Sequence, residues 1–283
     1  MFITTIHELD QLQALKEAGA DAIIVGIEGL SIRSCLNISL DQLHNVKQLC
    51  EQAHLLLYVN CLKLFMPQEM KSLRQGLQIC KEVGVDGIYF ADEGVLFEAI
   101  SLGIQDRLIY QPETLVTSSN DVSFYLDQGI QSVSLAHELS FDEIESMAQK
   151  QKNIEILIHG YFSILYSRRP LLTNYMDAIH QPKDMNRHRF DLIEQTRDEK
   201  MPIWQDDTGT HIFSAHPIQS LAQFASFQKL GLQRFRIDSI FKDDAWTCSI
   251  LKAYRGQEPI SDQEDGSDIW YHQSTIKVKE AGR

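Results

Sequence analysis

Short runs rich in strand-forming residues alternate with longer amphipathic stretches along most of the chain. The run at 154–158 is a short, mainly apolar run between polar residues, which is typical of a strand buried on both faces. These runs predict eight strands, at residues 2–6, 21–26, 54–60, 87–91, 107–110, 132–136, 154–158 and 234–237. The amphipathic stretches predict helices, at residues 7–18, 40–53, 68–83, 95–102, 121–127, 141–150, 218–230 and 244–254. Strands and helices that alternate through short connections predict a parallel sheet with right-handed crossovers.

Local signals support parts of this pattern. Ser140 precedes the helix at 141–150 and Glu143 follows three residues later, which is the pattern of a capping box. The alternation stops after the seventh predicted strand, where residues 166–213 contain two β-like runs around the hairpin turn signal Asp207-Thr208-Gly209. It resumes with the helix at 218–230 and the eighth strand.

A closed barrel explains the strand count and the length of 283 residues together. We therefore expect an α/β fold, a (β/α)8 TIM-type barrel with an insertion at about 166–213 after strand seven, rather than an open doubly wound sheet. On this interpretation residues 1–256 form a single barrel domain, and residues 257–283 form a polar C-terminal tail.

Polar residues that follow the strands of such a barrel meet at one rim, where active sites form. Carboxylates, histidines and an arginine at one mouth suit acid–base chemistry or the binding of an anion. The candidates at the strand ends are Glu28, Asn60, Asp92, Glu93, Gln111, His137, Glu138, His159, Arg236 and Asp238. The segment after the seventh strand adds Tyr161, Tyr166, Arg168 and Arg169. The alternatives are that Asp92 and Glu138 cap helices or pair with Arg236, and that the paired arginines belong to a solvated surface loop.

Composition narrows the class of protein. A net charge of −13 argues against a broad cationic surface for nucleic acid. The five cysteines form no C-x-x-C pair, so we expect reduced, mostly buried thiols. The histidines match no zinc motif, and no metal site is expected. No apolar run approaches the ~20 residues of a membrane helix, and the first ten residues lack the pattern of a secretory signal. These observations predict a cytoplasmic protein without a membrane segment.

Several segments together resemble a known family in both order and spacing. They are ADEGVLFEA, SVSLAHELSFDEI, IEILIHGYFSILYSRRPLLTNY, MPIWQDDTGTHIFSAHPI and GLQRFRIDSIFKD, spread from Gly19 to Asp243. They resemble the peptidase family U32 proteins, also called collagenase-like proteases. The resemblance implies the same barrel fold.

The chain departs from the iron–sulfur members of that family. Those members carry cysteines at positions that match Ser163 and Pro170 here, and further ones that are also missing. Because a [4Fe–4S] cluster needs four thiolates, we expect no cluster in this chain. His137 stands where an arginine is usual, and Asp238 stands where glutamate is common.

The resemblance implies a function as well. The chain resembles the shorter, cysteine-poor member of a pair needed for prephenate-dependent hydroxylation of the tRNA wobble uridine. It would act with a cysteine-bearing paralogue, with prephenate as a co-substrate and with tRNA bound through the complex. Arg168, Arg169 and Arg236 would bind the anion, and His159, Glu138 and Asp92 would orient it or transfer a proton.

Two other functions remain open. One is a peptidase that uses Glu138 and His159, although the sequence has no Gly-x-Ser-x-Gly or H-E-x-x-H motif. The other is a non-catalytic scaffold that stabilises a partner subunit.

Overall fold

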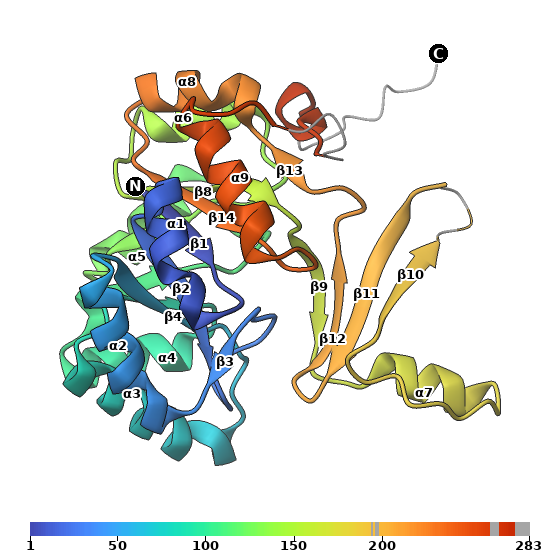
Figure 1. Cartoon of the computed structure of the whole chain (residues 1–283). Coiled ribbons are helices and arrows are strands. Elements are labelled where there is room, and N and C mark those ends of the chain that lie inside the picture. Colours follow the sequence, from blue (N-terminus) through green and yellow to red (C-terminus); the bar gives the residue numbers. More distant parts are fainter. Residues whose placement is uncertain (194, 196–197, 261–265, 275–283) are drawn as a thin grey trace.

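Eight parallel strands form a closed barrel in the computed structural model, which describes residues 1–193, 195, 198–260 and 266–274 (Figure 1). The ring closes because β1 pairs with both β2 and β14. The barrel strands are β1 (Phe2–Thr5), β2 (Ala22–Ile27), β4 (Leu56–Cys61), β5 (Gly87–Phe90), β6 (Leu108–Tyr110), β7 (Ser132–Ser134), β8 (Ile154–Gly160) and β14 (Arg234–Asp238). The predicted barrel is confirmed, since these are the eight expected strands in the expected order.

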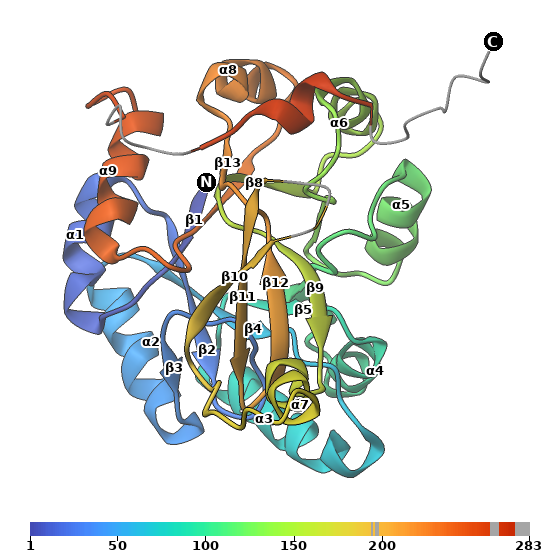
Figure 2. The same ribbon diagram turned by 90° about the vertical axis from the view of Figure 1, so that its right-hand side faces the viewer.

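Helices surround the barrel on its outer face (Figure 2). Their buried apolar side chains join the outward-facing strand residues in one continuous core, which is why the strands are rich in apolar residues. In the described part of the chain these helices are α1 (Leu12–Ala18), α2 (Leu43–Gln52), α3 (Met70–Val83), α4 (Glu93–Leu102), α5 (Ser119–Asp127), α6 (Phe141–Ala148), α8 (Leu221–Lys229) and α9 (Asp244–Tyr254). The predicted capping box of α6 is present. Among the described residues, no helix has both the length and the apolar character to cross a bilayer.

The inside of the barrel holds a buried ionic cluster. Glu155 on β8 is 0% exposed, and both of its carboxylate oxygens accept hydrogen bonds of 3.0 Å from the hydroxyl of Tyr89. Arg234 Nη2 lies 3.3 Å from Glu155 Oε2, and Arg236 Nε lies 3.5 Å from Oε1. A carboxylate removed from water needs such partners, because an unpaired buried charge is strongly destabilising.

The pairing of β8 with β14 contains a bulge near the mouth. Arg236 lies opposite Leu157, but the next residue, Ile237, lies opposite His159, so one residue of β8 is extra. Gly160 then adopts φ +124°, and a Cβ there would lie 2.1 Å from the backbone oxygen of Asp238. Glycine is therefore required at the end of this strand.

The insertion after β8 forms a separate antiparallel sheet, with α7 (Leu171–Ala178) at its far end (Figure 1). Its strand order is β10 (Arg189–Ile193), β11 (Lys200–Asp206), β12 (Gly209–Phe213) and β9 (Ser163–Ser167). The hairpin predicted at Asp207-Thr208-Gly209 joins β11 to β12. The insertion sheet starts slightly before the predicted residue 166, because β9 already pairs with β12 from Ser163.

Two smaller features follow the insertion. The helix predicted from residue 218 is wrong at its start, because β13 (Ile218–Gln219) pairs with β8 and α8 begins at Leu221. Part of the predicted tail, 261–265 and 275–283, lies outside the described residues. The described part includes Tyr271, whose ring packs on Phe227 at 5.5 Å and whose hydroxyl lies 2.6 Å from that of Ser220.

Replacing Glu155 by alanine should destabilise the fold by about 3–5 kcal/mol, because Arg234 and Arg236 would keep buried charges without their carboxylate. Urea unfolding followed by circular dichroism measures this difference. Glu258→Gln is the matched control, since Glu258 pairs with Lys252 on the surface and should change stability by less than about 0.5 kcal/mol. Equal stability of the two variants would contradict a structural role for the interior cluster.

Candidate functional site at the barrel mouth

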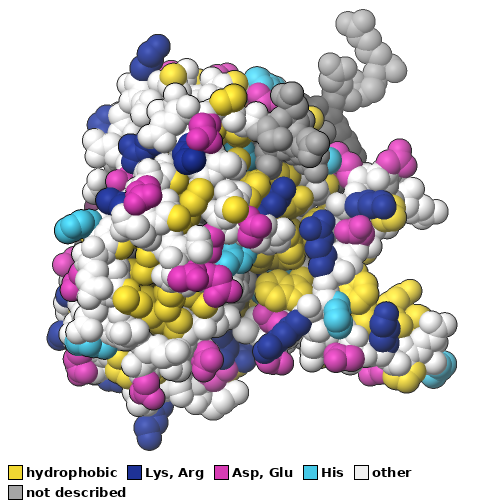
Figure 3. Space-filling view, in the orientation of Figure 1, with side chains coloured by type: hydrophobic (Ala, Val, Ile, Leu, Met, Phe, Trp, Pro, Cys, Tyr) yellow, Lys and Arg dark blue, Asp and Glu magenta, His cyan; other side chains and the backbone are white. Residues whose placement is uncertain are grey.

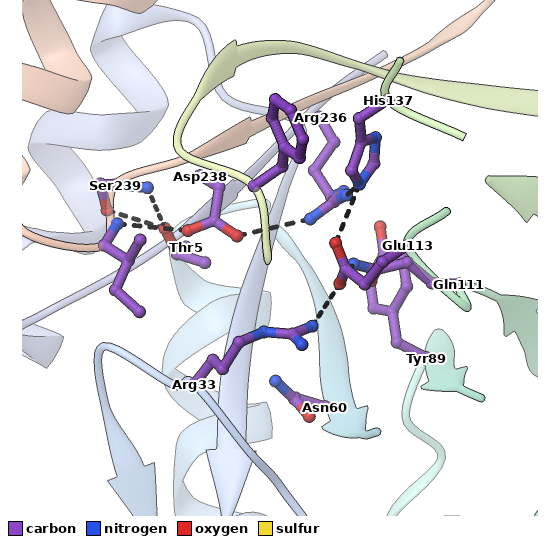
Figure 4. A network of polar contacts seen from close by, with 12 residues as sticks. Thr5, Arg33, Asn60, Tyr89, Gln111, Glu113, His137, Arg236, Asp238 and Ser239 are labelled. Carbon is purple, nitrogen blue, oxygen red and sulfur yellow. Dashed lines mark hydrogen bonds and ion pairs between the residues drawn. The ribbon is translucent and has the colours of Figure 1, made fainter. Parts of the chain in front are cut away.

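A chain of polar contacts crosses the mouth of the barrel (Figure 4). Arg33, in the loop after β2, forms an ion pair with Glu113, in the loop after β6. The other Glu113 oxygen lies 3.0 Å from Nε2 of His137, which follows β7. Arg236 on β14 lies 3.2 Å from the same Nε2 through Nη2, and its Nη1 lies 3.4 Å from Asp238. Loops far apart in the sequence are thus joined into one network.

Burial sets the protonation states in this network. Burial alone would raise the pKa of Glu113, but the charge of Arg33 and the hydrogen bond with His137 hold it well below its ordinary value. Burial lowers the pKa of His137, and the neighbouring charge of Glu113 opposes this shift without cancelling it. At neutral pH the network therefore contains a carboxylate at Glu113 and a neutral imidazole at His137.

A small cavity lies beneath this network, and we call it the inner cavity. Its volume is about 20 Å³, which is room for a water molecule. Its lining residues include the charged side chains Arg33, Arg236 and Asp238 and the amides of Asn60 and Gln111. The amide oxygen of Asn60 accepts from the backbone of Leu62 at 3.1 Å, and Gln111 donates to Glu113 at 2.8 Å. The cavity is thus polar and held by an ordered shell.

A larger pocket, the outer pocket, opens next to the inner cavity. It has a volume of about 210 Å³ and shares Arg33, Leu62 and Gln111 with the inner cavity. Exposed apolar side chains from the barrel loops and β9 form much of its wall, namely Leu64, Leu115, Ile164 and Leu165. Because an apolar cavity of about 150 Å³ can hold benzene, this pocket suits one substituted ring with a polar group directed at Arg33.

A groove runs between the barrel rim and the insertion sheet. One part of it, with a volume of about 260 Å³, is lined by Arg187, Arg189, Trp204 and Phe241. The guanidinium of Arg189 lies 4.8 Å from the ring centre of Phe241. On the face shown in Figure 3, acidic, basic and apolar side chains are intermixed.

The structure brings five predicted residues to the inner cavity and the outer pocket. Asn60, Gln111, Arg236 and Asp238 line the inner cavity, and Tyr166 lines the outer pocket. Tyr161 lies elsewhere, packed with Phe213 and Ile240 beside the groove.

His159 lies away from the mouth, contrary to its predicted catalytic position. It is 0% exposed, and its ring packs on Trp246 at 5.4 Å and on Tyr254 at 5.8 Å, both on α9. Side chains alternate between the two faces of a strand, so the extra residue in β8 turns His159 from the barrel interior to its outer face.

Two further predicted residues have structural partners. Asp92 caps α4, because its carboxylate accepts a hydrogen bond from the backbone N–H of Gly94 at 2.7 Å. It also accepts one from the backbone N–H of Phe65 at 2.8 Å. The contact with Gly94 is that of a helix cap, which was the alternative to a catalytic role. Arg168 forms a two-bond pair with Glu69, at 2.7 and 2.9 Å, and its hydrogen bond lowers the pKa of Glu69 to about 2. Neither Glu138 nor Arg169 is among the described residues that line the inner cavity or the outer pocket.

Sequence reasoning missed Arg33 and Glu113 as site residues. Arg33 lies six residues after the end of β2, and Glu113 lies three residues after the end of β6. Both are too far from their strands to be picked by a rule that takes the first polar residues after each strand. The signal in the sequence was the Gln111-Pro112-Glu113 run, in which the second polar residue faces the mouth.

The family resemblance can be tested against known proteins. The model of peptidase family U32 matches residues 7–270. The chain belongs to peptidase family U32. It is 27% identical to tRNA hydroxylation protein P2 of Bacillus subtilis (strain 168) over 260 residues, which is 90% of this chain and 84% of the relative. It is 22% identical to tRNA hydroxylation protein P1 of the same strain over 257 residues, covering 87% of this chain and 60% of that longer protein.

A solved structure supports the fold of this U32 protein. The structure of the U32 peptidase Mk0906 matches with a TM-score of 0.52 at 12% identity, covering 84% of this chain and 91% of that one. At this identity the likeness shows that the two proteins share the barrel fold. It carries no information about their chemistry.

The cysteines of this U32 protein are dispersed over the described residues. Ser163 is the first residue of β9, and Pro170 lies three residues after its last residue. Cys50, Cys61 and Cys80 are buried in the core outside the barrel, and burial raises the pKa of the Cys35 thiol beside the inner cavity to about 12. Among the described residues, no group of three or more histidines, cysteines or carboxylates is placed to hold a metal ion.

The protonation of His211 predicts a pH dependence of stability. His211 on β12 is fully buried and stacks on Tyr166 at 4.7 Å. Burial, together with the charge of Arg33, lowers its pKa from 6.5 to about 3. Below pH 6.5 the unfolded chain binds a proton that the folded chain does not, so stability falls as the pH falls.

When the pH is lowered from 7 to 5, the free energy of unfolding should fall in both proteins. The fall should be about 1–2 kcal/mol smaller in His211→Phe than in the wild type. Urea unfolding at both pH values measures this difference. His272→Phe is the control, because His272 lies on the surface with its side chain 64% exposed. Parallel losses in the wild type and His211→Phe would show that His211 is not held neutral by the fold.

Proposed function

We propose that this U32 protein is a component of prephenate-dependent 5-hydroxylation of the tRNA wobble uridine. The observation that carries the proposal is the barrel-mouth site of Arg33 and Arg236 beside a ring-sized pocket, in a chain similar along 90% of its length to tRNA hydroxylation protein P2. A cyclic carboxylate such as prephenate suits both parts of this site, because its anion pairs with guanidinium groups and its ring packs on apolar walls.

The proposed roles follow from the positions of the side chains. Arg33 and Arg236 bind the anion of the co-substrate, and Asn60 and Gln111 hold the polar shell around it. His137 positions Arg236 through its Nε2 and stays neutral near pH 7. The apolar wall of the outer pocket holds the rest of the ligand and excludes water from it.

The proposal includes a partner subunit. A chain with a net charge of −13 repels phosphate, and neutralisation of phosphates dominates affinity for nucleic acid. We therefore propose that a cysteine-bearing U32 paralogue contributes the basic surface for tRNA, and that it supplies any cluster chemistry. The complex would act in the cytoplasm, where tRNA is modified.

One observation favours a second candidate, a non-catalytic scaffold. Each charged side chain that lines the inner cavity has an ion-pair partner within this chain. Such internal pairing is expected of side chains that only stabilise the barrel. The two candidates differ in whether Arg33 and Arg236 are needed beyond folding.

A deletion strain should lose hydroxylated wobble uridine from its tRNA, measured by mass spectrometry of nucleosides. Wild-type protein and the surface variant Lys252→Gln should restore the modification. Arg236→Gln and Arg33→Gln should lower it by at least about tenfold, because each removes a charge that pairs with the ligand.

Thermal unfolding of each purified variant provides the folding control. Full hydroxylation in the deletion strain would exclude the proposed function. Full restoration by both folded arginine variants would favour the scaffold instead.

A further inference from the structure

We infer that Glu113 closes the inner cavity as an internal carboxylate, and that a ligand carboxylate enters by replacing Glu113 on Arg33. This inference rests on the proposed function for the identity of the site. Glu113 would control access to the site, and it would inhibit ligand binding by competing for Arg33.

The first observation is the backbone of the paired residues. Arg33 has φ 51° and Glu113 has φ 66°, so both occupy the left-handed region that side chains other than glycine rarely adopt. They are 80 residues apart and form an ion pair with each other. Such conformations persist where the surroundings hold them, and they gather at ligand clamps and switches. The ion pair is a contact that holds both loops in place.

The second observation is the position of the pair. Arg33 lines both the inner cavity and the outer pocket, whereas Glu113 lines the outer pocket. The side chains remain 9% and 15% exposed, so a ligand in the outer pocket reaches the pair directly. When the pair opens, the cavity of about 20 Å³ joins the pocket of about 210 Å³.

The third observation is the charge balance. Three arginines and three carboxylates make up the network inside the mouth, a net charge of 3 − 3 = 0 with His137 neutral. They are Arg33, Arg234, Arg236, Glu113, Glu155 and Asp238. Moving Glu113 out leaves 3 − 2 = +1, which one ligand carboxylate neutralises. A carboxylate also reproduces the geometry that Glu113 presents to Arg33.

His137 makes the exchange feasible. Its Nε2 lies 3.0 Å from Glu113 Oε2 and 3.2 Å from Arg236 Nη2. One ring nitrogen either donates to the carboxylate or accepts from the guanidinium, but it cannot do both. When Glu113 leaves, Nε2 accepts from Arg236 and remains satisfied. Glu113 in turn becomes hydrated in the outer pocket.

Competition of this kind selects among ligands. A free anion must displace Glu113, so its apparent affinity falls by the fraction of molecules in which the pair is open. A carboxylate attached to an apolar ring gains additional contacts with Leu64, Leu115 and Ile164 in the outer pocket. Every anion must open the pair, and only a ring-bearing carboxylate offsets that cost with contacts to the apolar wall of the outer pocket.

Calorimetric titration of the full-length protein with benzoate tests the inference. Glu113→Gln should bind benzoate at least about tenfold more tightly than the wild type, because the amide keeps the shape of the side chain and loses the charge that competes for Arg33. Glu69→Gln is the matched control. Glu69 also pairs with an arginine at the rim, but outside both pockets, so this variant should match the wild type.

Two further variants separate opening from anion pairing. Arg33→Gln also breaks the pair but removes the binding group, so it should bind benzoate no better than the wild type. Glu113→Asp retains the charge on a shorter side chain and should bind benzoate more tightly than the wild type, which keeps the test decisive if Glu113→Gln does not fold.

Equal or weaker binding of benzoate by folded Glu113→Gln would overturn the inference, and so would an equal gain in Glu69→Gln. Inorganic phosphate is the second probe, and a preference of Glu113→Gln for phosphate over benzoate would overturn the carboxylate assignment. These outcomes leave the nucleoside analysis of the deletion strain unaffected, so failure of the inference is distinguishable from failure of the proposed function.

Discussion

The mouth of this barrel depends on the buried ion pairs of Glu155 with Arg234 and Arg236. Glu155 is 0% exposed, and its partners Tyr89, Arg234 and Arg236 come from two other strands. Removing a carboxylate from water is costly unless charges and hydrogen bonds compensate it. Because Glu155 fixes the inner side of the Arg236 guanidinium, the outer side of that group is aimed at His137 and the inner cavity. The interior ion pairs therefore set the geometry of the site above them.

The insertion sheet adds a second constraint by limiting access to that site. It extends beside the barrel mouth (Figure 1), and β9 contributes the exposed side chains Ile164 and Leu165 to the wall of the outer pocket. His211 on the neighbouring strand is buried neutral, and the positive charge of Arg33 is one reason for its low pKa. The sheet and the mouth are thus electrostatically coupled, and a ligand that reaches Arg33 passes between apolar walls.

The sequence predicted the fold well because burial on both faces leaves a strong signal. Runs such as residues 154–158 are apolar except for Glu155, and they became strands of the barrel in the expected order. The site was predicted less well. A bulge in β8 changes no residue type, so the sequence did not reveal that His159 turns outward. Asp92 looked catalytic because capping residues and catalytic carboxylates occupy the same position after a strand. Glu113 was missed because its role comes from a loop conformation and from a partner 80 residues away.

In the proposed function, a ring-bearing carboxylate binds between Arg33 and Arg236 at the mouth of the barrel. A crystal structure of the wild-type protein grown with prephenate tests it most directly. We expect a ligand carboxylate within hydrogen-bond distance of both guanidinium groups, the ring in the outer pocket and the Glu113 carboxylate turned away from Arg33. Prephenate bound at another place, or bound while Arg33 still pairs with Glu113, would contradict it.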